Sequence, residues 1–326
     1  MKKVLCGLLS LVVMLTSIQL NVLPAEAATT EMTIYDLYLG VNTGASSAEA
    51  EEDAGKGGDS VMLESKGEYL LMDLGYYEQA QKYVIPFIKK HKIKELSIYF
   101  SHMHIDHYAG KSTDITAGID AVASIPGIKI KNLYFPDASI GRTDPDYSGK
   151  YEKFVDAYNS YGNTTGKIVR LKKGKTFTIG AAFAEVIGPV NITKKMSTND
   201  LSLVTMITCG KTRYLTAGDC LGTQEQLLLK EYKGTSKLRA DIMKLSHHGT
   251  PQANTKEFIK QVRPQYAFAQ NSGYTGMLTE NSNKWRVMHH AWSTINDYGM
   301  AYLTANEKKD LIIKVSNNAI SLYKGT

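Results

Sequence analysis

The stretch SHMHIDHYAG, residues 101–110, constrains the fold more strongly than any other part of the sequence. It carries three of the chain's eight histidines together with an aspartate, all within six positions. The apolar run ELSIYFS (95–101) before it predicts a strand, and the residues beyond it lead into a predicted helix. Side chains two positions apart project to the same side of a strand end. The pattern therefore predicts that nitrogen and oxygen donors converge where this strand ends: His102, His104, Asp106 and His107.

Imidazole and carboxylate groups without a thiolate suit Zn²⁺, and also Mn²⁺ or Fe. The alternative is a set of unrelated, exposed loop histidines, but the H-x-H-x-D-H spacing at a strand end favours metal binding. One turn cannot complete the ligand shells of two ions, so partners are expected at other strand ends. Asp219 follows the strand of RYLTAGDC, and His247 and His248 follow that of DIMKLSHHGT. Asp219 could bridge two cations, although a turn aspartate after glycine is the simpler alternative.

The periodicity of the chain predicts an α/β (α+β) fold of four layers. Strand-rich and α/β stretches follow one another twice, which indicates two half-domains whose sheets pack face to face with helices outside, an αββα sandwich. The acidic, glycine-rich segment 45–59 is expected to be a mobile loop. Strands are expected at 32–40, 60–65, 67–75, 95–101, 167–171, 176–180, 182–188, 201–209, 212–218, 240–246, 265–271, 311–317 and 319–324. Helices are expected at 76–94, 112–125, 151–162, 223–232, 255–262 and 281–299.

These motifs resemble the metallo-β-lactamase superfamily, whose pattern is H-x-H-x-D-H, a bridging aspartate after glycine, and a later histidine. The resemblance begins at LLMDLG, where Asp73 matches an early structural aspartate of the family, and covers essentially the whole of residues 28–326. It implies two divalent metal ions, Zn²⁺ first and Mn²⁺ as the alternative. The implied ligands are His102 and His104 for the first ion, Asp106, His107 and His247 for the second, and Asp219 as the bridge. Which of His247 and His248 is the ligand stays open.

One departure from the family pattern concerns the first ion. The superfamily commonly has a further histidine before the bridging aspartate, but no histidine occurs between Tyr108 and Ser246. STNDLSLVTM stands there, and its Asn199 and Asp200 are predicted to support the first ion or the substrate; an ordinary turn pair is the alternative. This segment and KLSHHGT resemble the competence-type DNA-uptake branch and, even more, the phosphorylcholine esterases that trim teichoic acids.

Two close cations favour phosphodiester hydrolysis, because they lower the pKa of a water molecule and hold phosphoryl oxygens. We therefore expect a secreted phosphodiesterase that acts on a phosphodiester of the cell envelope or its surroundings, with phosphorylcholine on teichoic acid as one candidate substrate. Asp106 is expected to act in catalysis, and His248 to donate a proton or bind phosphate, unless it only packs behind the ligands. An extracellular nuclease and a non-catalytic wall-polymer binding module are the alternatives. The resemblance also suggests an aromatic box for a quaternary ammonium group, with Tyr274, Trp285 and Trp292 as its candidates.

The first 27 residues predict the compartment. Lys2 and Lys3 precede an apolar run that ends in Ala25-Glu26-Ala27, a pattern typical of a secretory signal peptide, with an uncleaved anchor as the alternative. Residues 28–326 are expected to form one catalytic domain, secreted and without a later membrane span.

The remaining composition adds little to this prediction. Cys209 and Cys220 are too few for a disulfide framework; Cys209 fits as a small core residue, and one bridge between the two is the alternative. A net charge of +6 suits an anionic substrate or polymer, and ordinary surface charge explains it equally well.

Overall fold

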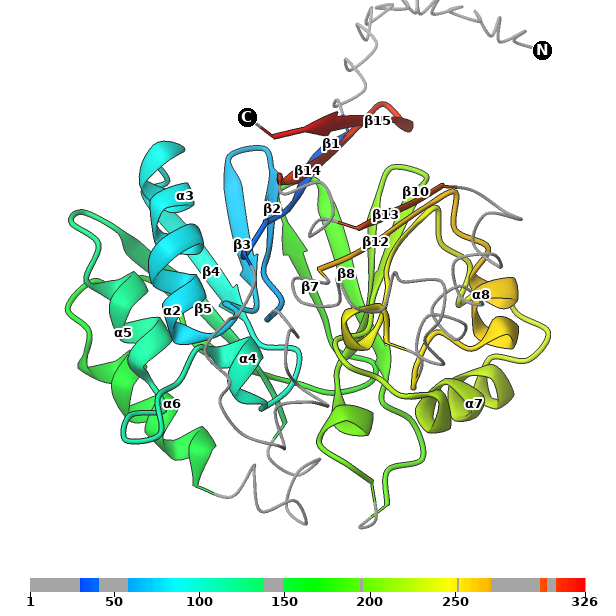
Figure 1. Ribbon diagram of the computed structural model, residues 1–326, viewed down its shortest axis with the longest axis horizontal. Helices are drawn as coiled ribbons and strands as arrows, with labels where there is room; N and C mark the ends of the chain where they lie inside the picture. Colours follow the sequence, from blue (N-terminus) through cyan, green and yellow to red (C-terminus); the bar gives the residue numbers. More distant parts are fainter. Residues whose placement is uncertain are drawn as a thin grey trace, which may run out of the picture.

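The computed structural model describes residues 30–40, 58–137, 149–193, 196–250, 252–270, 300–303 and 309–325. Within these residues the strands form two mixed sheets that pack face to face, and helices cover the outer face of each sheet (Figure 1). This arrangement confirms the αββα sandwich predicted from the order of strand-rich and helix-rich stretches.

The first sheet has eight described strands in the order β15-β14-β1-β2-β3-β4-β5-β6. The strands from β3 to β6 run parallel, and the other neighbours run antiparallel. Their bounds are β1 (Glu31–Asp36), β2 (Val61–Ser65), β3 (Glu68–Met72), β4 (Glu95–Tyr99), β5 (Lys129–Pro136), β6 (Ile168–Leu171), β14 (Leu311–Ser316) and β15 (Ala319–Lys324).

The second sheet has seven described strands in the order β13-β12-β11-β10-β9-β8-β7, and those from β10 to β13 are parallel. Their bounds are β7 (Thr176–Ile179), β8 (Ala182–Gly188), β9 (Val204–Cys209), β10 (Thr212–Thr216), β11 (Ile242–Lys244), β12 (Tyr266–Ala269) and β13 (Met300–Leu303). Each sheet therefore contains a parallel half, and the loops that follow parallel strands gather at one edge of a sheet, where such folds place their sites.

A continuous helical segment covers the first sheet. It consists of α2 (Tyr77–Gln79), the π-helical η1 (Ala80–Val84) and α3 (Ile85–Lys90). The widened π turn ends two residues before Pro86, which has no N–H to donate to the carbonyl four residues earlier.

The other helices complete the outer layers. α5 (Ala117–Ala123) and α6 (Lys150–Ser160) lie beside α3 on the first sheet, and α7 (Gly222–Glu231) and α8 (Lys256–Val262) lie against the second (Figure 1).

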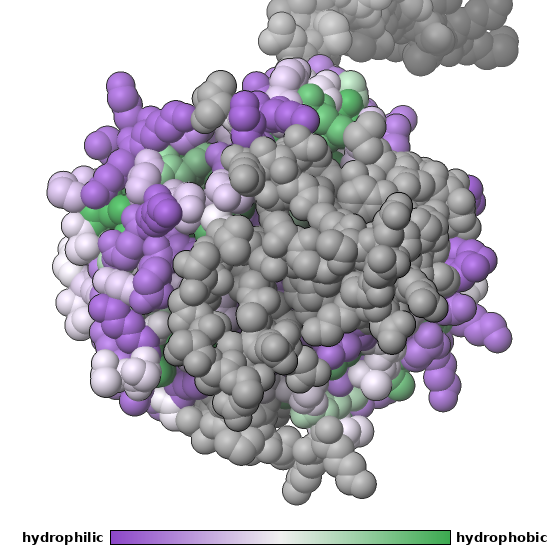
Figure 2. All heavy atoms as spheres, viewed as in Figure 1, coloured by the Kyte–Doolittle hydropathy of each residue, from purple (hydrophilic) through white to green (hydrophobic). Residues whose placement is uncertain are grey.

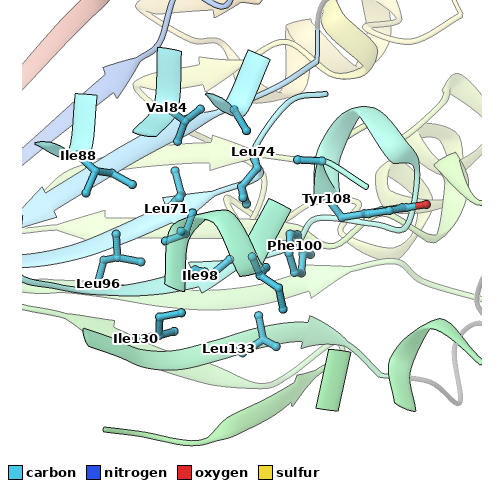
Figure 3. Close-up of a cluster of buried hydrophobic side chains, with 14 of the residues drawn as sticks. Leu71, Leu74, Val84, Ile88, Leu96, Ile98, Phe100, Tyr108, Ile130 and Leu133 are labelled. Atoms are coloured by element: carbon cyan, nitrogen blue, oxygen red, sulfur yellow. The ribbon is translucent and has the colours of Figure 1, made fainter. Parts of the chain in front are cut away.

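Strand alternation divides the core into layers. In β3, Leu71 points to the helical side and belongs to the cluster shown in Figure 3. Its neighbours Leu70 and Met72 point the other way, into the cluster between the two sheets. A third cluster, which includes Leu228 and Phe258, joins the second sheet to α7 and α8. In β4 likewise, Leu96 and Ile98 belong to the cluster on the helical side and Tyr99 to the cluster between the sheets, so this strand is buried on both faces.

Some elements differ from the sequence prediction. The first strand ends at Asp36 rather than at residue 40, and the helix predicted at 112–125 is shortened to α5. β5 and β13 were not predicted, since no strand was expected between residues 101 and 167 or between residues 271 and 311. The helix predicted at 281–299 lies outside the described residues.

The described surface turned to the viewer in Figure 2 is mostly hydrophilic. Large apolar side chains are exposed at few described positions, among them Ile105 and Phe183. None of the helices in the described ranges is both long and apolar enough to cross a membrane.

Candidate metal centre

The loop after β4 carries the H-x-H-x-D-H residues into a short helix, α4 (Ile105–Tyr108). Asp73, directly after β3, anchors this loop: its carboxylate accepts hydrogen bonds from the backbone N–H (2.8 Å) and the hydroxyl (2.6 Å) of Ser101. Asp73 Oδ2 also lies 2.9 Å from His107 Nδ1. A proton on Nδ1 leaves the lone pair of His107 Nε2 available to a metal ion.

One group of ligand atoms forms around His107 and His248. His107 Nε2 lies 3.2 Å from Asp219 Oδ2 and 3.7 Å from Asp106 Oδ2. His248 Nε2 lies 3.3 Å and 3.2 Å from the same two oxygens. Asp59 also offers a carboxylate oxygen within 4.8 Å of the ligand atoms of His107, Asp219 and His248. This second-ion group thus combines imidazole and carboxylate, as a site for Zn²⁺ or Mn²⁺ requires.

A neighbouring group forms around His102 and His104. His102 Nε2 lies 3.1 Å from His104 Nδ1 and 3.7 Å from Asp219 Oδ2. Among the described residues, these are the two groups whose atoms could hold an ion, and Asp219 belongs to both. Two clusters that share a carboxylate are consistent with a dinuclear metal site, which His102, His104, His107, Asp219 and His248 would hold, with Asp219 common to both clusters.

The buried ligand atoms fit cations because several have no other partner. His107 Nε2, His248 Nε2 and Asp219 Oδ1 are buried without a hydrogen bond. Buried polar atoms in folded proteins are almost always satisfied, so a cluster of unsatisfied ones needs an explanation. Divalent ions supply it, since both lone pairs and the carboxylate would then be coordinated.

The electrostatics lead to the same result. Burial by itself raises the pKa of Asp219, but the charges of His107 and His248 reverse this effect and hold the pKa well below its ordinary value. Burial lowers the pKa of His107, but Asp219 and Asp106 raise it well above the usual range. Without metal ions, the buried carboxylates therefore favour protons on His107 and His248. Divalent cations bound at the same place would displace these protons and balance the carboxylate charge.

The two adjacent histidines have different surroundings. His248 occupies the place beside Asp106 and His107 that the sequence analysis assigned to His247. His247 Nε2 lies 4.0 Å from Asp219 Oδ2 and 3.4 Å from Asn199 Nδ2. Its Nδ1 lies 2.5 Å from Thr250 Oγ1. His247 thus stands at the margin of the cluster.

The neighbouring side chains of Asn199 and Asp200 also have different surroundings. Asn199 lies beside His247, and its Oδ1 is buried without a hydrogen bond. Asp200 accepts hydrogen bonds from the hydroxyls of Ser197 (3.2 Å) and Thr223 (2.7 Å), so its carboxylate holds a turn together. Its predicted role at the substrate receives no support from this geometry, because both oxygens are engaged away from the ligand atoms.

A cavity of about 290 Å³ opens over the ligand groups. Two residues that sequence reasoning missed line it: Tyr76, at the start of α2, and the partly exposed Ile105. Tyr76 belongs to no polar motif, and Ile105 occupies the unspecified position between His104 and Asp106 of H-x-H-x-D-H, so the sequence pattern marks neither side chain. The other lining residues are His104, Asp106, Asn199, Asp219, His247 and His248.

Other predicted features lie outside this centre. Tyr274, Trp285 and Trp292 fall outside the described residues, and so do residues 1–27. Cys209 and Cys220 are both buried and both free, so the alternative of a disulfide bridge between them is wrong.

Comparisons with known proteins agree with this fold. No family model matches the chain. ComE operon protein 3 of Bacillus subtilis is 26% identical over 192 residues, which are 59% of this chain and 22% of that protein. Competence protein ComA of Neisseria gonorrhoeae is 26% identical over 223 residues, 68% of this chain and 26% of that protein. The metallo-β-lactamase-fold protein YhfI of Bacillus subtilis superposes with a TM-score of 0.51 at 12% identity, covering 91% of this chain and all of YhfI.

The two sheets, the outer helices and the shared-carboxylate cluster define the chain as a metallo-β-lactamase-fold protein. Within this class it is related to the competence proteins. The chain spans about a quarter of the length of these curated relatives.

Proposed function

We propose that this protein is a metal-dependent phosphodiesterase. The observation that carries the proposal is the pair of ligand groups that share Asp219 beneath a polar cavity of about 290 Å³. A buried His/Asp cluster of this kind is typical of metal hydrolases with this fold. Two divalent ions at such a site lower the pKa of water and neutralise charge on phosphoryl oxygens.

The protein's own residues divide the remaining tasks. Asp219 belongs to both groups, and Asp106 Oδ2, 3.7 Å from His107 Nε2 and 3.2 Å from His248 Nε2, would bind the second ion together with these two histidines. We assign His248 to the second ion, and His247 with Asn199 to the oxygens of the bound phosphodiester, because both line the cavity beside the ligand atoms. Tyr76 and Ile105 form its apolar margin and would contact the organic part of the substrate.

The substrate we favour is a phosphodiester of the cell envelope, such as phosphorylcholine on teichoic acid. The support is the resemblance of KLSHHGT and its surroundings to the phosphorylcholine esterases, together with the signal-peptide pattern of residues 1–27, which would deliver the protein outside the cell. An aromatic box that includes Tyr274, Trp285 or Trp292 would hold the quaternary ammonium group.

An extracellular nuclease is the second candidate. The similarity to Competence protein ComA and to Recombination protein 2 of Haemophilus influenzae favours it, because their names refer to competence and recombination. A nuclease would bind its polyanionic substrate with a steep dependence on salt. A non-catalytic wall-polymer module is the third, and it would have no need of two ligand groups sharing a carboxylate.

The test combines metal analysis with a substrate panel. We expect about two divalent ions per chain, and turnover of bis-p-nitrophenyl phosphate that is lost in Asp219→Asn. Preference for p-nitrophenyl phosphorylcholine supports the esterase, and salt-sensitive digestion of single-stranded DNA supports the nuclease. Metal-loaded protein that hydrolyses none of the three contradicts the phosphodiesterase.

A further inference from the structure

A buried ion pair lies directly behind the metal centre. Asp59 is 1% exposed and Lys244 is 4% exposed, and the Lys244 ammonium donates a hydrogen bond to Asp59 Oδ2. The other oxygen, Asp59 Oδ1, lies 3.1 Å from His248 Nδ1. The three side chains thus form a chain of contacts, which we call the Lys244–Asp59–His248 chain.

The backbone around Asp59 is held in place on two sides. Its N–H donates to the carbonyl of Asp106 (3.2 Å), and its carbonyl accepts from Gly75 N–H (2.8 Å). The preceding Gly58 is so close to its neighbours that a Cβ there would lie 2.4 Å from the Asp106 carbonyl oxygen. Asp59 is therefore positioned by the same loop that carries the ligand Asp106, and its distance from the metal centre is fixed.

The two ring nitrogens of His248 face different partners. Nδ1 faces Asp59, and Nε2 faces Asp106 and Asp219 at 3.2 Å and 3.3 Å. The buried Lys244 ammonium donates to Asp59 Oδ2, and a buried ammonium requires an ionised partner. Asp59 is thus a carboxylate, and an ionised carboxylate can only accept hydrogen bonds. The proton of neutral His248 then sits on Nδ1, and the lone pair of Nε2 points to the ligand group.

Asp59 itself lies within reach of the second-ion group, so it could be taken for a ligand. Its contacts argue for a different role. One oxygen is engaged by Lys244 and the other by His248, whereas the unpartnered buried atoms of the cluster belong to His107, His248 and Asp219.

We propose that Asp59 is a positioning residue that fixes the tautomer and orientation of His248 for the second metal ion, and that Lys244 holds the Asp59 carboxylate in place. This inference rests on the metal centre of the proposed function but not on its substrate. It makes Lys244 and Asp59, which come from opposite sheets, part of one functional unit with His248.

The decisive variant is Asp59→Asn. The Lys244 ammonium can only donate, so it will donate to the oxygen of the new side-chain amide. The amide NH₂ group then faces His248 Nδ1. Nδ1 must accept, the ring proton moves to Nε2, and Nε2 no longer binds the metal ion. We expect affinity at one of the two sites to fall by about 10–100-fold, the usual effect of removing a partner that orients a ligand.

The double variant Asp59→Asn with Lys244→Gln supplies the rescue. The glutamine oxygen can accept from the amide NH₂, which frees the amide oxygen to accept from His248 Nδ1–H again. We expect this variant to recover most of the lost affinity, although it carries two changes instead of one. Lys237→Gln is the matched control, because Lys237 also pairs with a carboxylate, Glu185, but on the surface of the second sheet.

Two measurements that do not depend on substrate read the result: metal content after dialysis against graded free Zn²⁺, and the absorption spectrum of the Co²⁺-loaded protein. Loss of one ion in the single variant, its recovery in the double variant and no change in the control support the proposal. Wild-type affinity in the single variant overturns it. So does a loss that the double variant leaves unrepaired, or a failure of both variants to fold, since the pair would then serve folding alone. Phosphodiester turnover enters neither measurement, so the proposed substrate class can fail independently.

Discussion

His247 and His248 have left-handed backbone angles, with φ of 49° and 55°. Such angles cost about 1–2 kcal/mol for a residue with a Cβ atom. The strained turn directs the two imidazoles to different partners: His248 to the buried carboxylates, His247 to Asn199 and Thr250. Strain of this kind is retained where a site requires it.

Alanine substitutions should separate the roles of the two histidines. His248→Ala should reduce the metal content from about two ions to about one, because the second-ion group loses its Nε2. His247→Ala should keep both ions and lower kcat/KM on bis-p-nitrophenyl phosphate, since its ring lines the cavity. Metal analysis and steady-state kinetics check both. The opposite pattern would return the ligand role to His247.

Asn199 and Asp200 should behave differently although they are neighbours. Asn199→Ala should keep the metal ions and lower kcat/KM by about 10–100-fold, the effect of one lost hydrogen bond to a charged substrate. Asp200→Ala should leave kcat/KM nearly unchanged and lower the unfolding free energy by about 1–3 kcal/mol, because it loses the contacts with Ser197 and Thr223. Kinetics together with urea unfolding distinguish the two. A large kinetic loss in Asp200→Ala would refute the structural assignment.

At the scale of single strands and helices, the sequence predicts those features that follow from the spacing of apolar and polar residues within the element. The alternation of β3 predicts its two buried faces, and the H-x-H-x-D-H spacing predicts the ligands that follow β4. β13 has only four residues, Met300–Leu303, and its place is set by pairing with β12, which no pattern within the strand reveals.

Asp59 was missed for a related reason. It ends a segment whose composition indicates a loop, and its partners Lys244 and His248 stand 185 and 189 positions away. For the same reason the sequence could not decide between His247 and His248: ring direction depends on the backbone angles of the turn.

α7 contains a carboxyl group that should make stability depend on pH. Burial raises the pKa of Glu225 to about 7, even though the backbone N–H groups of Asn254 and Thr255 donate to it. The unfolded chain has the ordinary value of 4.5. Between these two pKa values the folded state binds the proton more tightly than the unfolded chain does. The contribution of Glu225 to the free energy of unfolding is therefore complete below pH 4.5 and is lost as the pH rises through 7. At about 1.36 kcal/mol per pKa unit, the loss is on the order of 3 kcal/mol.

Glu225→Gln should remove the decrease of the unfolding free energy that Glu225 causes between pH 4.5 and 7. Chemical unfolding of the wild type and the variant between pH 4.5 and 7.5 measures it as the difference between two curves, which cancels the other titrating groups. Glu78→Gln, on the exposed face of α2 and without a charge contact to Glu225, is the control and should follow the wild type. Parallel curves for Glu225→Gln and the wild type would show that Glu225 keeps an ordinary proton affinity.

At the scale of the whole molecule, polar contacts join the two sheets beneath the metal centre. Besides Lys244 and Asp59, the Tyr99 hydroxyl lies 2.8 Å from Thr205 Oγ1, and Ser60 N–H donates to Gln270 Oε1 at 2.6 Å. The interior also holds the carboxylates of Asp73, Asp106 and Asp219. Breaking a buried ion pair by removing one partner costs about 3–5 kcal/mol. The Lys244–Asp59 pair both joins the two sheets and contacts His248, so a change in the charge of the metal centre should also change the stability of the sheet packing.

Metal removal should accordingly destabilise the entire fold rather than one loop. Ions that bind only the folded state stabilise it by about 2.7 kcal/mol per site when free metal is 100 times Kd, which for a chain of this size corresponds to a rise in Tm on the order of 5 °C. A chelator should reverse this rise, and added Zn²⁺ or Mn²⁺ should restore it. Asp219→Asn, which alters both ligand groups, should have a Tm that hardly responds to either addition. Scanning calorimetry of both proteins decides the matter: a wild-type Tm that is indifferent to chelator and metal would mean that the buried histidines and carboxylates balance their charges with protons alone.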